Sequence, residues 1–332
     1  MPKAPSGPVP VVVVGLGVIG QHIARAAHAS EELELIGAVD VNPRLVGKKL
    51  SDVAQVPLPL KVAKSLAEAV GKAKGVVVLH STSSRLEQVM DQLLEAINLK
   101  CSVVSTCEEL SFPYLKYPEM AERLDLAAQK AGVSVVGTGV NPGFVLDRLV
   151  ATVAQVSGTV RHLSAVRVVD ARTRREALQR KVGAGMTEDE FHDLAEKDQI
   201  GHVGLVESAA LAALGAGLDC DDFEEELVPV LAEEDITGGA FVVKKGKVAG
   251  MNQVAVGLSE GQEKVRLELT IAVGADNPGD HIIVDGDVRV ELTIKDGIAG
   301  DAATANLVVN AAPRISAAEP GLLTVLELPA GR

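Results

Sequence analysis

Aromatic residues are scarce in this sequence: 332 residues include no Trp, two Tyr and five Phe. A core must therefore be built mainly from Val, Leu, Ile and Ala, a composition typical of parallel strands buried on both faces. Basic residues are also outnumbered, with 32 Lys and Arg against 45 Asp and Glu, for a net charge of −13. A surface of this sign repels phosphate backbones, so we expect no nucleic-acid partner.

Cysteines and long apolar runs are few as well. An odd set of three, Cys101, Cys107 and Cys220, suits a reducing compartment, and we expect a cytoplasmic protein. No apolar run approaches the length of about 18 residues that a membrane span needs. The Pro-rich start lacks the apolar segment of a signal peptide. The seven histidines are scattered without metal-ligand spacing, so no metal is predicted.

Two patterns of hydrophobicity divide the chain. Short apolar runs alternate with amphipathic stretches up to about residue 140, which predicts a parallel sheet with helical crossovers. Apolar residues then recur at every second position over 265–273 and 288–294, which predicts antiparallel strands. We predict an α/β protein with a Rossmann domain over 1–140, a second α+β domain with a mostly antiparallel sheet over 141–300, and a C-terminal helix and tail, 301–332, returning to the first domain.

Local patterns in the second half predict particular elements. Thr187, followed three residues later by Glu190, forms a capping box and predicts the start of a helix. The Lys245-Gly246 pair predicts a hairpin turn between short strands at 241–243 and 248–249.

A glycine-rich turn follows the first predicted strand, a run of four valines. Gly15, Gly17 and Gly20 fit the G-x-G-x-x-G pattern, with Val18 and Ile19 opening a helix. In this pattern the first glycine makes the turn, the second admits a pyrophosphate, and the third lets helix and strand pack closely. The helix N-terminus adds unpaired N–H groups. Because a strand ending in an acid comes next, we predict a dinucleotide site rather than a purely structural turn.

The acid that ends the second predicted strand is Asp40. Its carboxylate can accept hydrogen bonds from both ribose hydroxyls and repels a 2′-phosphate, which favours NAD. Asn42 and Arg44 follow closely, and Arg44 could receive a 2′-phosphate if Asp40 turned away. An ordinary surface charge is the simpler interpretation of Arg44. The predicted cofactor is therefore NAD or NADP.

Small polar side chains end the fourth predicted strand, namely His80, Ser81, Thr82 and Ser83. Ligands of open α/β sheets bind beyond the carboxyl ends of the strands, so we expect these residues to contact the cofactor. Ser83 could equally cap the following helix.

Two adjacent carboxylates follow the fifth predicted strand, after Thr106 and Cys107. This strand end normally lies beside the nicotinamide, so Thr106 and Cys107 are expected near the cofactor. Neighbouring side chains of an extended segment point to opposite sides, so only one of Glu108 and Glu109 would face a ligand. The alternative is a solvated acidic loop.

A second glycine-rich turn, residues 137–144, follows the sixth predicted strand. Pro142 suits the first turn of a helix that would run on through Leu149. Asn141 could cap that helix or donate a hydrogen bond to a ligand.

Longer motifs resemble those of the native amine dehydrogenases and their relatives, the 2,4-diaminopentanoate dehydrogenases, within a wider dihydrodipicolinate-reductase-like group. The resemblance extends over nearly the whole chain. Its motifs occupy residues 105–110, 137–144, 181–186 and 201–208, with shorter matches at 309–311 and 320–322. The His-His pair and the Lys-x-Asp-x-Pro-Ser-Gly-Thr segment of dihydrodipicolinate reductases themselves are not found in the second domain.

The resemblance implies reversible oxidative deamination of a primary amine to a ketone and ammonia. It further implies a homodimer built through the sheet of the second domain, and a catalytic glutamate that we place at Glu108. A substrate pocket with Phe144, Val145, Leu146 and His202 is also implied. Relatives often have an aromatic residue where this chain has Val145, so we expect more room for bulky ketones.

Three functions stay open. The first is an amine dehydrogenase that acts on simple ketones and amines. The second is a 2,4-diaminopentanoate dehydrogenase, whose carboxylate substrate would need a cation such as Arg172 or Arg174. The third is a non-catalytic dinucleotide-sensing module with the same fold. A carboxylate at Glu108 argues against the third, because a sensor needs no acid–base group.

Overall fold

The computed structural model describes residues 7–174, 176–329 and 331. The chain divides into two compact units. The first comprises Met1–Phe144 and Ala299–Arg332, and the second comprises Val145–Ile298. The unit that begins the chain therefore also contains its last 34 residues, counted from 299 to 332.

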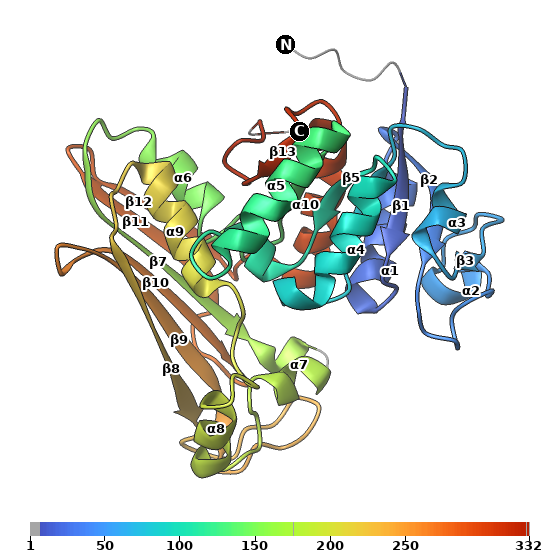
Figure 1. Ribbon diagram of the computed structural model, residues 1–332. Coiled ribbons are helices and arrows are strands. Elements are labelled where there is room, and N and C mark those ends of the chain that lie inside the picture. Colours follow the sequence, from blue (N-terminus) through green and yellow to red (C-terminus); the bar gives the residue numbers. More distant parts are fainter. Residues whose placement is uncertain (1–6, 175, 330, 332) are drawn as a thin grey trace. The chain divides into compact units, whose positions relative to one another are not determined.

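A seven-stranded parallel sheet forms the middle of the first unit (Figure 1). The strand order is β13-β6-β5-β4-β1-β2-β3. The order reverses between β1 and β4, so a topological switch point lies at their carboxyl ends. The predicted Rossmann sheet is confirmed. Its strands are β1 (Val9–Val14), β2 (Leu33–Val39), β3 (Val62–Ala63), β4 (Val77–His80), β5 (Ser102–Ser105), β6 (Ser134–Gly137) and β13 (Gly321–Leu323).

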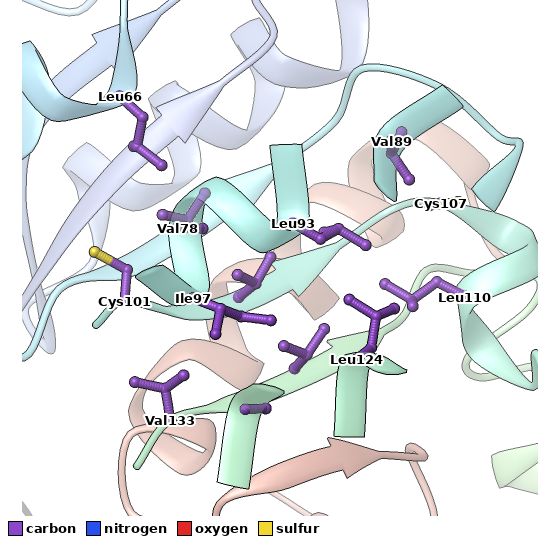
Figure 2. Packing of buried hydrophobic residues seen from close by; sticks show 14 of the residues in the cluster. Leu66, Val78, Val89, Leu93, Ile97, Cys101, Cys107, Leu110, Leu124 and Val133 are labelled. Carbon is purple, nitrogen blue, oxygen red and sulfur yellow. The ribbon is translucent and has the colours of Figure 1, made fainter. Parts of the chain in front are cut away.

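Helices cover both faces of this sheet. On α4 (Leu86–Asn98), apolar residues recur at helical spacing, and Leu86, Val89, Leu93 and Ile97 are buried. Figure 2 shows Leu93 and Ile97 in one cluster with Val78 of β4 and Leu124 of α5. The helices are α1 (Val18–Ala29), α2 (Leu50–Ala54), α3 (Leu66–Val70), α4, α5 (Pro118–Ala131) and α10 (Gly300–Ile315), with a short 3₁₀ helix η1 (Glu108–Ser111).

A six-stranded sheet forms the second unit, in the order β12-β11-β7-β10-β9-β8. Neighbouring strands are antiparallel except β7 and β10, which are parallel. The predicted mostly antiparallel sheet is confirmed. Its strands are β7 (Val160–Asp170), β8 (Asp222–Leu231), β9 (Val248–Ser259), β10 (Gln262–Ala272), β11 (Gly279–Gly286) and β12 (Val290–Lys295).

The period-two pattern of β10 explains how this sheet is covered. Val265, Leu267 and Leu269 are buried, whereas Arg266 is exposed and Glu268 is half-buried. The buried set faces α9 (Leu205–Ala216), which packs on β8, β9 and β10 (Figure 1). The other helices of this unit are α6 (Arg148–Ala154), η2 (Ala171–Thr173), α7 (Glu176–Lys181) and α8 (Glu188–Ala195).

Of the predictions made for single elements of the second half of the chain, some are confirmed and some are wrong. The capping box at Thr187 and Glu190 is confirmed at the start of α8. The helix expected to begin at Pro142 is wrong: α6 begins at Arg148, whose N–H donates to the Asp147 carboxylate. The Lys245-Gly246 turn lies in the connection between β8 and β9 rather than in a separate short hairpin, because Val248 pairs with Leu231.

Candidate active site

Two positions of the glycine-rich turn after β1 have a geometry that only glycine allows. Gly15 has φ +87°, and a Cβ there would come within 2.6 Å of the Ser81 carbonyl oxygen. A Cβ on Gly20 would collide with the Gly15 carbonyl oxygen. At Gly17, by contrast, a Cβ would meet nothing within 4 Å. Two glycines therefore close the turn, and the third leaves open space above the backbone, as the approach of a pyrophosphate requires.

The N-terminus of α1 faces this open space. Gly17 is the N-cap residue, no side chain caps the helix, and its first turn contains no acidic residue. The unpaired N–H groups and the positive end of the helix dipole suit an anion. Val18 is 44% exposed and Ile19 is half-buried, so this turn is accessible.

The Asp40 carboxylate is held against the same turn. One of its oxygens accepts a hydrogen bond from Leu16 N–H at 2.7 Å, and the other accepts from Asn42 N–H at 2.8 Å. Asn42 in turn accepts from Arg44 N–H at 3.0 Å, and both residues are exposed. Each carboxylate oxygen keeps a further lone pair for a ribose hydroxyl. The two backbone donors hold Asp40 toward the turn.

The segment after β4 lies against the glycine turn. Ser81 Oγ donates to the Gly15 carbonyl oxygen at 3.1 Å, and Thr82 is exposed. Ser83 accepts from Arg85 N–H at 3.3 Å, but Arg85 itself is the N-cap of α4. Ser83 therefore supports the start of the helix from outside it rather than as its N-cap residue.

Two side chains predicted to contact the cofactor are buried instead. His80 is 2% exposed, and both ring nitrogens have protein partners. Cys107 is fully buried, and its thiol lies 3.3 Å from the Ser84 carbonyl oxygen. Burial raises the pKa of the Cys107 thiol, which keeps it protonated and unreactive. Thr106 is half-buried at the strand end.

The two adjacent glutamates differ in their surroundings. Both lie in η1, so their side chains diverge around a tight helix rather than alternating along an extended segment. Glu108 is half-buried at the start of η1. The Glu109 side chain is 1% exposed, with Lys116 Nζ at 2.9 Å and Arg85 Nη1 at 3.0 Å from one oxygen. Glu108 is thus the carboxylate accessible at this strand end.

Glu109 is held as an anion by a complete set of donors. Its second oxygen accepts from Leu86 N–H at 2.7 Å, in the first turn of α4. Burial acts to raise the pKa of Glu109, but hydrogen bonds from Lys116, Leu86 N–H and Arg85 outweigh it and hold the pKa below its usual value. The sequence patterns did not indicate this network, because Arg85 and Lys116 come from other segments of the chain and meet Glu109 only in the fold.

Asn141 presents an unsatisfied acceptor in the turn after β6. Its Oδ1 is buried without a hydrogen-bond partner among the described residues. Such an atom is costly unless a donor reaches it, and the carboxamide N–H₂ of a nicotinamide is a donor of that kind. Together with the open turn at Gly17 and the Asp40 carboxylate, Asn141 gives the first unit residues that fit a nicotinamide dinucleotide.

The proposed substrate-pocket residues separate into two groups. Val145 and Leu146 are 0% exposed, whereas Phe144 and His202 keep part of their surface accessible. A side chain with no accessible surface does not border an open space, so the structure departs from the prediction for Val145 and Leu146.

His202 lies in the second unit, where Gln253 binds both of its backbone polar groups. Gln253 Oε1 accepts from His202 N–H at 2.8 Å, and Gln253 Nε2 donates to the His202 carbonyl oxygen at 2.9 Å. Burial, together with the nearby charges of Lys181 and Arg167, lowers the pKa of His202 to about 3. The ring is therefore neutral, and its Nε2 has no partner among the described residues.

Two kinds of feature are absent from the described residues. Within residues 7–174, 176–329 and 331, no group of His, Cys, Asp and Glu side chains is placed to hold a metal ion. In the same residues, no helix is long and apolar enough to cross a bilayer.

These features define a class: an oxidoreductase with a Rossmann dinucleotide site and a second α+β unit. The chain belongs to the family with a 2,4-diaminopentanoate dehydrogenase C-terminal domain, which matches residues 144–332, more than half of the chain. Residues 9–107 match the N-terminal domain of dihydrodipicolinate reductase. The family resemblance and the dehydrogenase class predicted from the sequence are confirmed.

Individual relatives agree with this assignment. The chain is 26% identical over 333 residues to a 2,4-diaminopentanoate dehydrogenase of Acetoanaerobium sticklandii, covering 98% of this chain and 94% of the relative. It is 23% identical over 350 residues to an amine dehydrogenase of Streptomyces virginiae, covering 96% and 95%. The solved amine dehydrogenase of Mycobacterium smegmatis has the same fold, with a TM-score of 0.84 at 19% identity over 99% and 98% of the two chains.

Proposed function

We propose that this protein is an NAD(P)-dependent amine dehydrogenase. The reaction converts a primary ammonium ion, oxidised dinucleotide and water into a ketone, ammonium, reduced dinucleotide and a proton, and it runs in reverse as reductive amination. The observation that carries the proposal is the contrast at the end of β5, where Glu109 is fully paired inside the protein and Glu108 is accessible. An accessible carboxylate at this strand end can move protons for a substrate.

Glu108 is the proposed catalytic residue. In amination, the carboxylate takes a proton from ammonium, so that neutral ammonia can attack the ketone carbon. The acid form then protonates the leaving hydroxyl of the carbinolamine, which departs as water. The anion finally stabilises the substrate iminium electrostatically. A bound nicotinamide supplies the hydride in amination and accepts it in deamination.

The proposed dinucleotide contacts follow from the first unit. The pyrophosphate would be held at the start of α1 by Gly15, Gly17, Val18, Ile19 and Gly20. Further contacts would come from Asp40, Asn42, Ser81, Thr82, Ser83, Thr106 and Asn141. NAD is the preferred form, because the Asp40 carboxylate is held toward the turn by Leu16 N–H, where it repels a 2′-phosphate. NADP would depend on Arg44, which is exposed.

The proposed substrate is a simple amine or ketone. His202 is neutral and its buried Nε2 has no partner among the described residues, so this side chain adds no charge. Phe144 adds half-buried apolar surface. Both features suit an uncharged ketone.

A second candidate is oxidation of 2,4-diaminopentanoate, favoured by the match of residues 144–332 to the C-terminal domain of that dehydrogenase family. Its carboxylate would need a cation. Arg172 already pairs with Asp170 at 2.7 Å, so a substrate carboxylate would compete with an internal one.

We further propose a cytoplasmic homodimer that joins through the open face of the six-stranded sheet. Val166, Val254 and Val256 alternate with the buried residues that face α9, and they are half-buried apolar groups on the opposite face. The free thiols of Cys101, Cys107 and Cys220 suit a reducing compartment.

Steady-state kinetics with ammonia, NADH or NADPH and a graded panel of ketones tests the proposal, with 2,4-diaminopentanoate assayed in the oxidative direction. Turnover of simple ketones supports the amine dehydrogenase. Turnover of 2,4-diaminopentanoate alone transfers the assignment to the second candidate. Dinucleotide binding without any turnover would leave only the sensing module.

A further inference from the structure

His80 joins two strand ends that the proposed chemistry uses for different purposes. It is the last residue of β4 and pairs with Ser105, the last residue of β5. The imidazole is buried, and its two nitrogens bind partners on different elements. A buried ring with a partner on each side acts as a rigid link between those partners.

The Nδ1 side leads to the turn that carries Glu108. Nδ1 lies 2.8 Å from Ser105 Oγ, and Ser105 Oγ accepts from Cys107 N–H at 3.0 Å. The backbone adds a parallel tie, since Thr106 N–H donates to the His80 carbonyl oxygen at 2.9 Å. His80 is thus connected, through Ser105, to the residue directly before Glu108.

The Nε2 side leads to the segment after β4. Nε2 lies 2.8 Å from Gln92 Oε1 and 2.9 Å from Thr82 Oγ1. The Thr82 hydroxyl donates to the same Gln92 oxygen at 2.8 Å. A carboxamide oxygen only accepts, so Nε2 carries a hydrogen, and in the neutral ring Nδ1 accepts from Ser105.

The lowered pKa of His80 favours the neutral ring. Burial lowers the pKa of His80 below its usual value, against the hydrogen bond to Gln92, which raises it. The neutral tautomer satisfies every polar atom of the ring. It also gives the chain of hydrogen bonds one direction, from Cys107 N–H through Ser105 and His80 to Gln92.

We propose that His80 is a positioning residue with two separable tasks. Through Nδ1 and Ser105 it orients the turn that carries Glu108, and through Nε2 and Gln92 it orients Thr82 at the dinucleotide edge. The inference rests on the proposed function and goes beyond it, since the ring is 2% exposed and would act through Ser105 and Gln92.

Two substitutions separate these tasks. In His80→Gln, the longer carboxamide reaches the place of Nε2 and loses Ser105. In His80→Asn, the shorter carboxamide occupies the place of Nδ1 and loses Gln92. We expect His80→Gln to lower kcat by about tenfold to a hundredfold, the cost of a misplaced reacting group, with KM for NADH unchanged. We expect His80→Asn to keep kcat near the wild-type value and to raise KM for NADH. Equal losses in both variants would overturn the division of tasks.

Hydrogen exchange gives a readout that needs no turnover. The peptide containing Cys107 should exchange faster in His80→Gln than in the wild type or in His80→Asn. Val78→Ala, in the buried part of β4, is the stability control and should lower the melting temperature without this local change. If the wild type turns over no amine or ketone, the proposed function fails while the exchange test still applies. Unchanged exchange at Cys107 in His80→Gln would overturn the positioning role.

Discussion

Glu108 and Glu109 are the same residue type in consecutive positions, yet they differ in how deeply they are buried. Glu109 is almost fully buried and accepts from Lys116, Arg85 and Leu86 N–H, whereas Glu108 is half-buried at the start of η1. Burial with full pairing makes a carboxylate a fixed structural anion, and partial exposure leaves a carboxylate able to exchange protons with a substrate. Adjacent residues can therefore divide structure and chemistry between them.

The largest effect is expected for Glu108→Gln, which keeps the shape of the side chain but removes the carboxylate that transfers protons. We expect kcat to fall by about 10²- to 10⁴-fold, the usual contribution of general acid–base catalysis. The Kd for NADH and the melting temperature should stay at wild-type values. Steady-state kinetics measures kcat, a fluorescence titration measures the Kd, and thermal unfolding measures the melting temperature. Near-normal kcat would remove Glu108 from the proposed role.

Glu109→Gln should instead act on stability. Replacing an anion that accepts charge-assisted hydrogen bonds is expected to lower the free energy of unfolding by about 1.5–3 kcal/mol. Denaturant unfolding at neutral pH measures this, with Glu108→Gln as the matched control of equal size. If Glu109→Gln lost activity but kept the wild-type stability, the catalytic role would belong to Glu109 and the structural role to Glu108.

The stability difference between wild type and Glu109→Gln should depend on pH, because the pKa of Glu109 is lowered in the folded protein. Its stabilisation is complete above the unfolded-state Glu pKa of about 4.3. It is lost as the pH falls through the lower folded-state value. The stability difference between wild type and Glu109→Gln should therefore be constant above about pH 5 and shrink on acidification below about pH 4.3. A difference that grows toward low pH would contradict the ionised state of Glu109.

A second pair of neighbours, Phe144 and Val145, extends the comparison to the proposed substrate pocket. Val145 is fully buried, so Val145→Trp should overpack the protein at a cost of about 1–3 kcal/mol. We expect a lower melting temperature and an equal relative loss of kcat/KM for small and large ketones. A selective loss for long or cyclic ketones, at an unchanged melting temperature, would return Val145 to the pocket wall.

The smallest effect is expected at Asp40, a partly exposed carboxylate. It accepts hydrogen bonds from two backbone N–H groups, whereas Glu109 accepts from one backbone N–H and from two cationic side chains. Asp40→Ala removes both ribose acceptance and repulsion of a 2′-phosphate. The ratio of kcat/KM for NADH over NADPH should fall by about tenfold, which corresponds to about 1.4 kcal/mol. An unchanged ratio would show that Asp40 does not contact the ribose.

Patterns in the sequence predicted the parts of the fold that depend on local regularity. Parallel strands buried on both faces are continuous apolar runs, and the turn at Gly15 marks the first of them. Strand β8 was not predicted, because it lies at the edge of its sheet and Glu224, Glu225 and Glu226 interrupt any alternation. Edge strands commonly carry charge, which removes the hydrophobic period.

The position of the candidate site could be predicted, but the environment of its residues could not. Asp40, His80 and Glu108 lie at or just after the ends of predicted strands, so their place at the edge of the sheet could be predicted. Whether a side chain faces a ligand or the interior depends on partners from distant elements, such as Gln92 for His80 and Lys116 for Glu109. The expectation that Glu108 and Glu109 alternate assumed an extended segment, whereas η1 forms there.

The most direct test is a stopped-flow single turnover with Glu108→Gln and Glu109→Gln side by side. Each variant is loaded with NADH and mixed with ketone and ammonia, and the oxidation of NADH is followed below the melting temperature of both. The account predicts that Glu108→Gln binds NADH but oxidises it about 10²- to 10⁴-fold more slowly than the wild type. Glu109→Gln is expected to oxidise NADH faster than Glu108→Gln. Faster oxidation by Glu108→Gln than by Glu109→Gln would contradict the account.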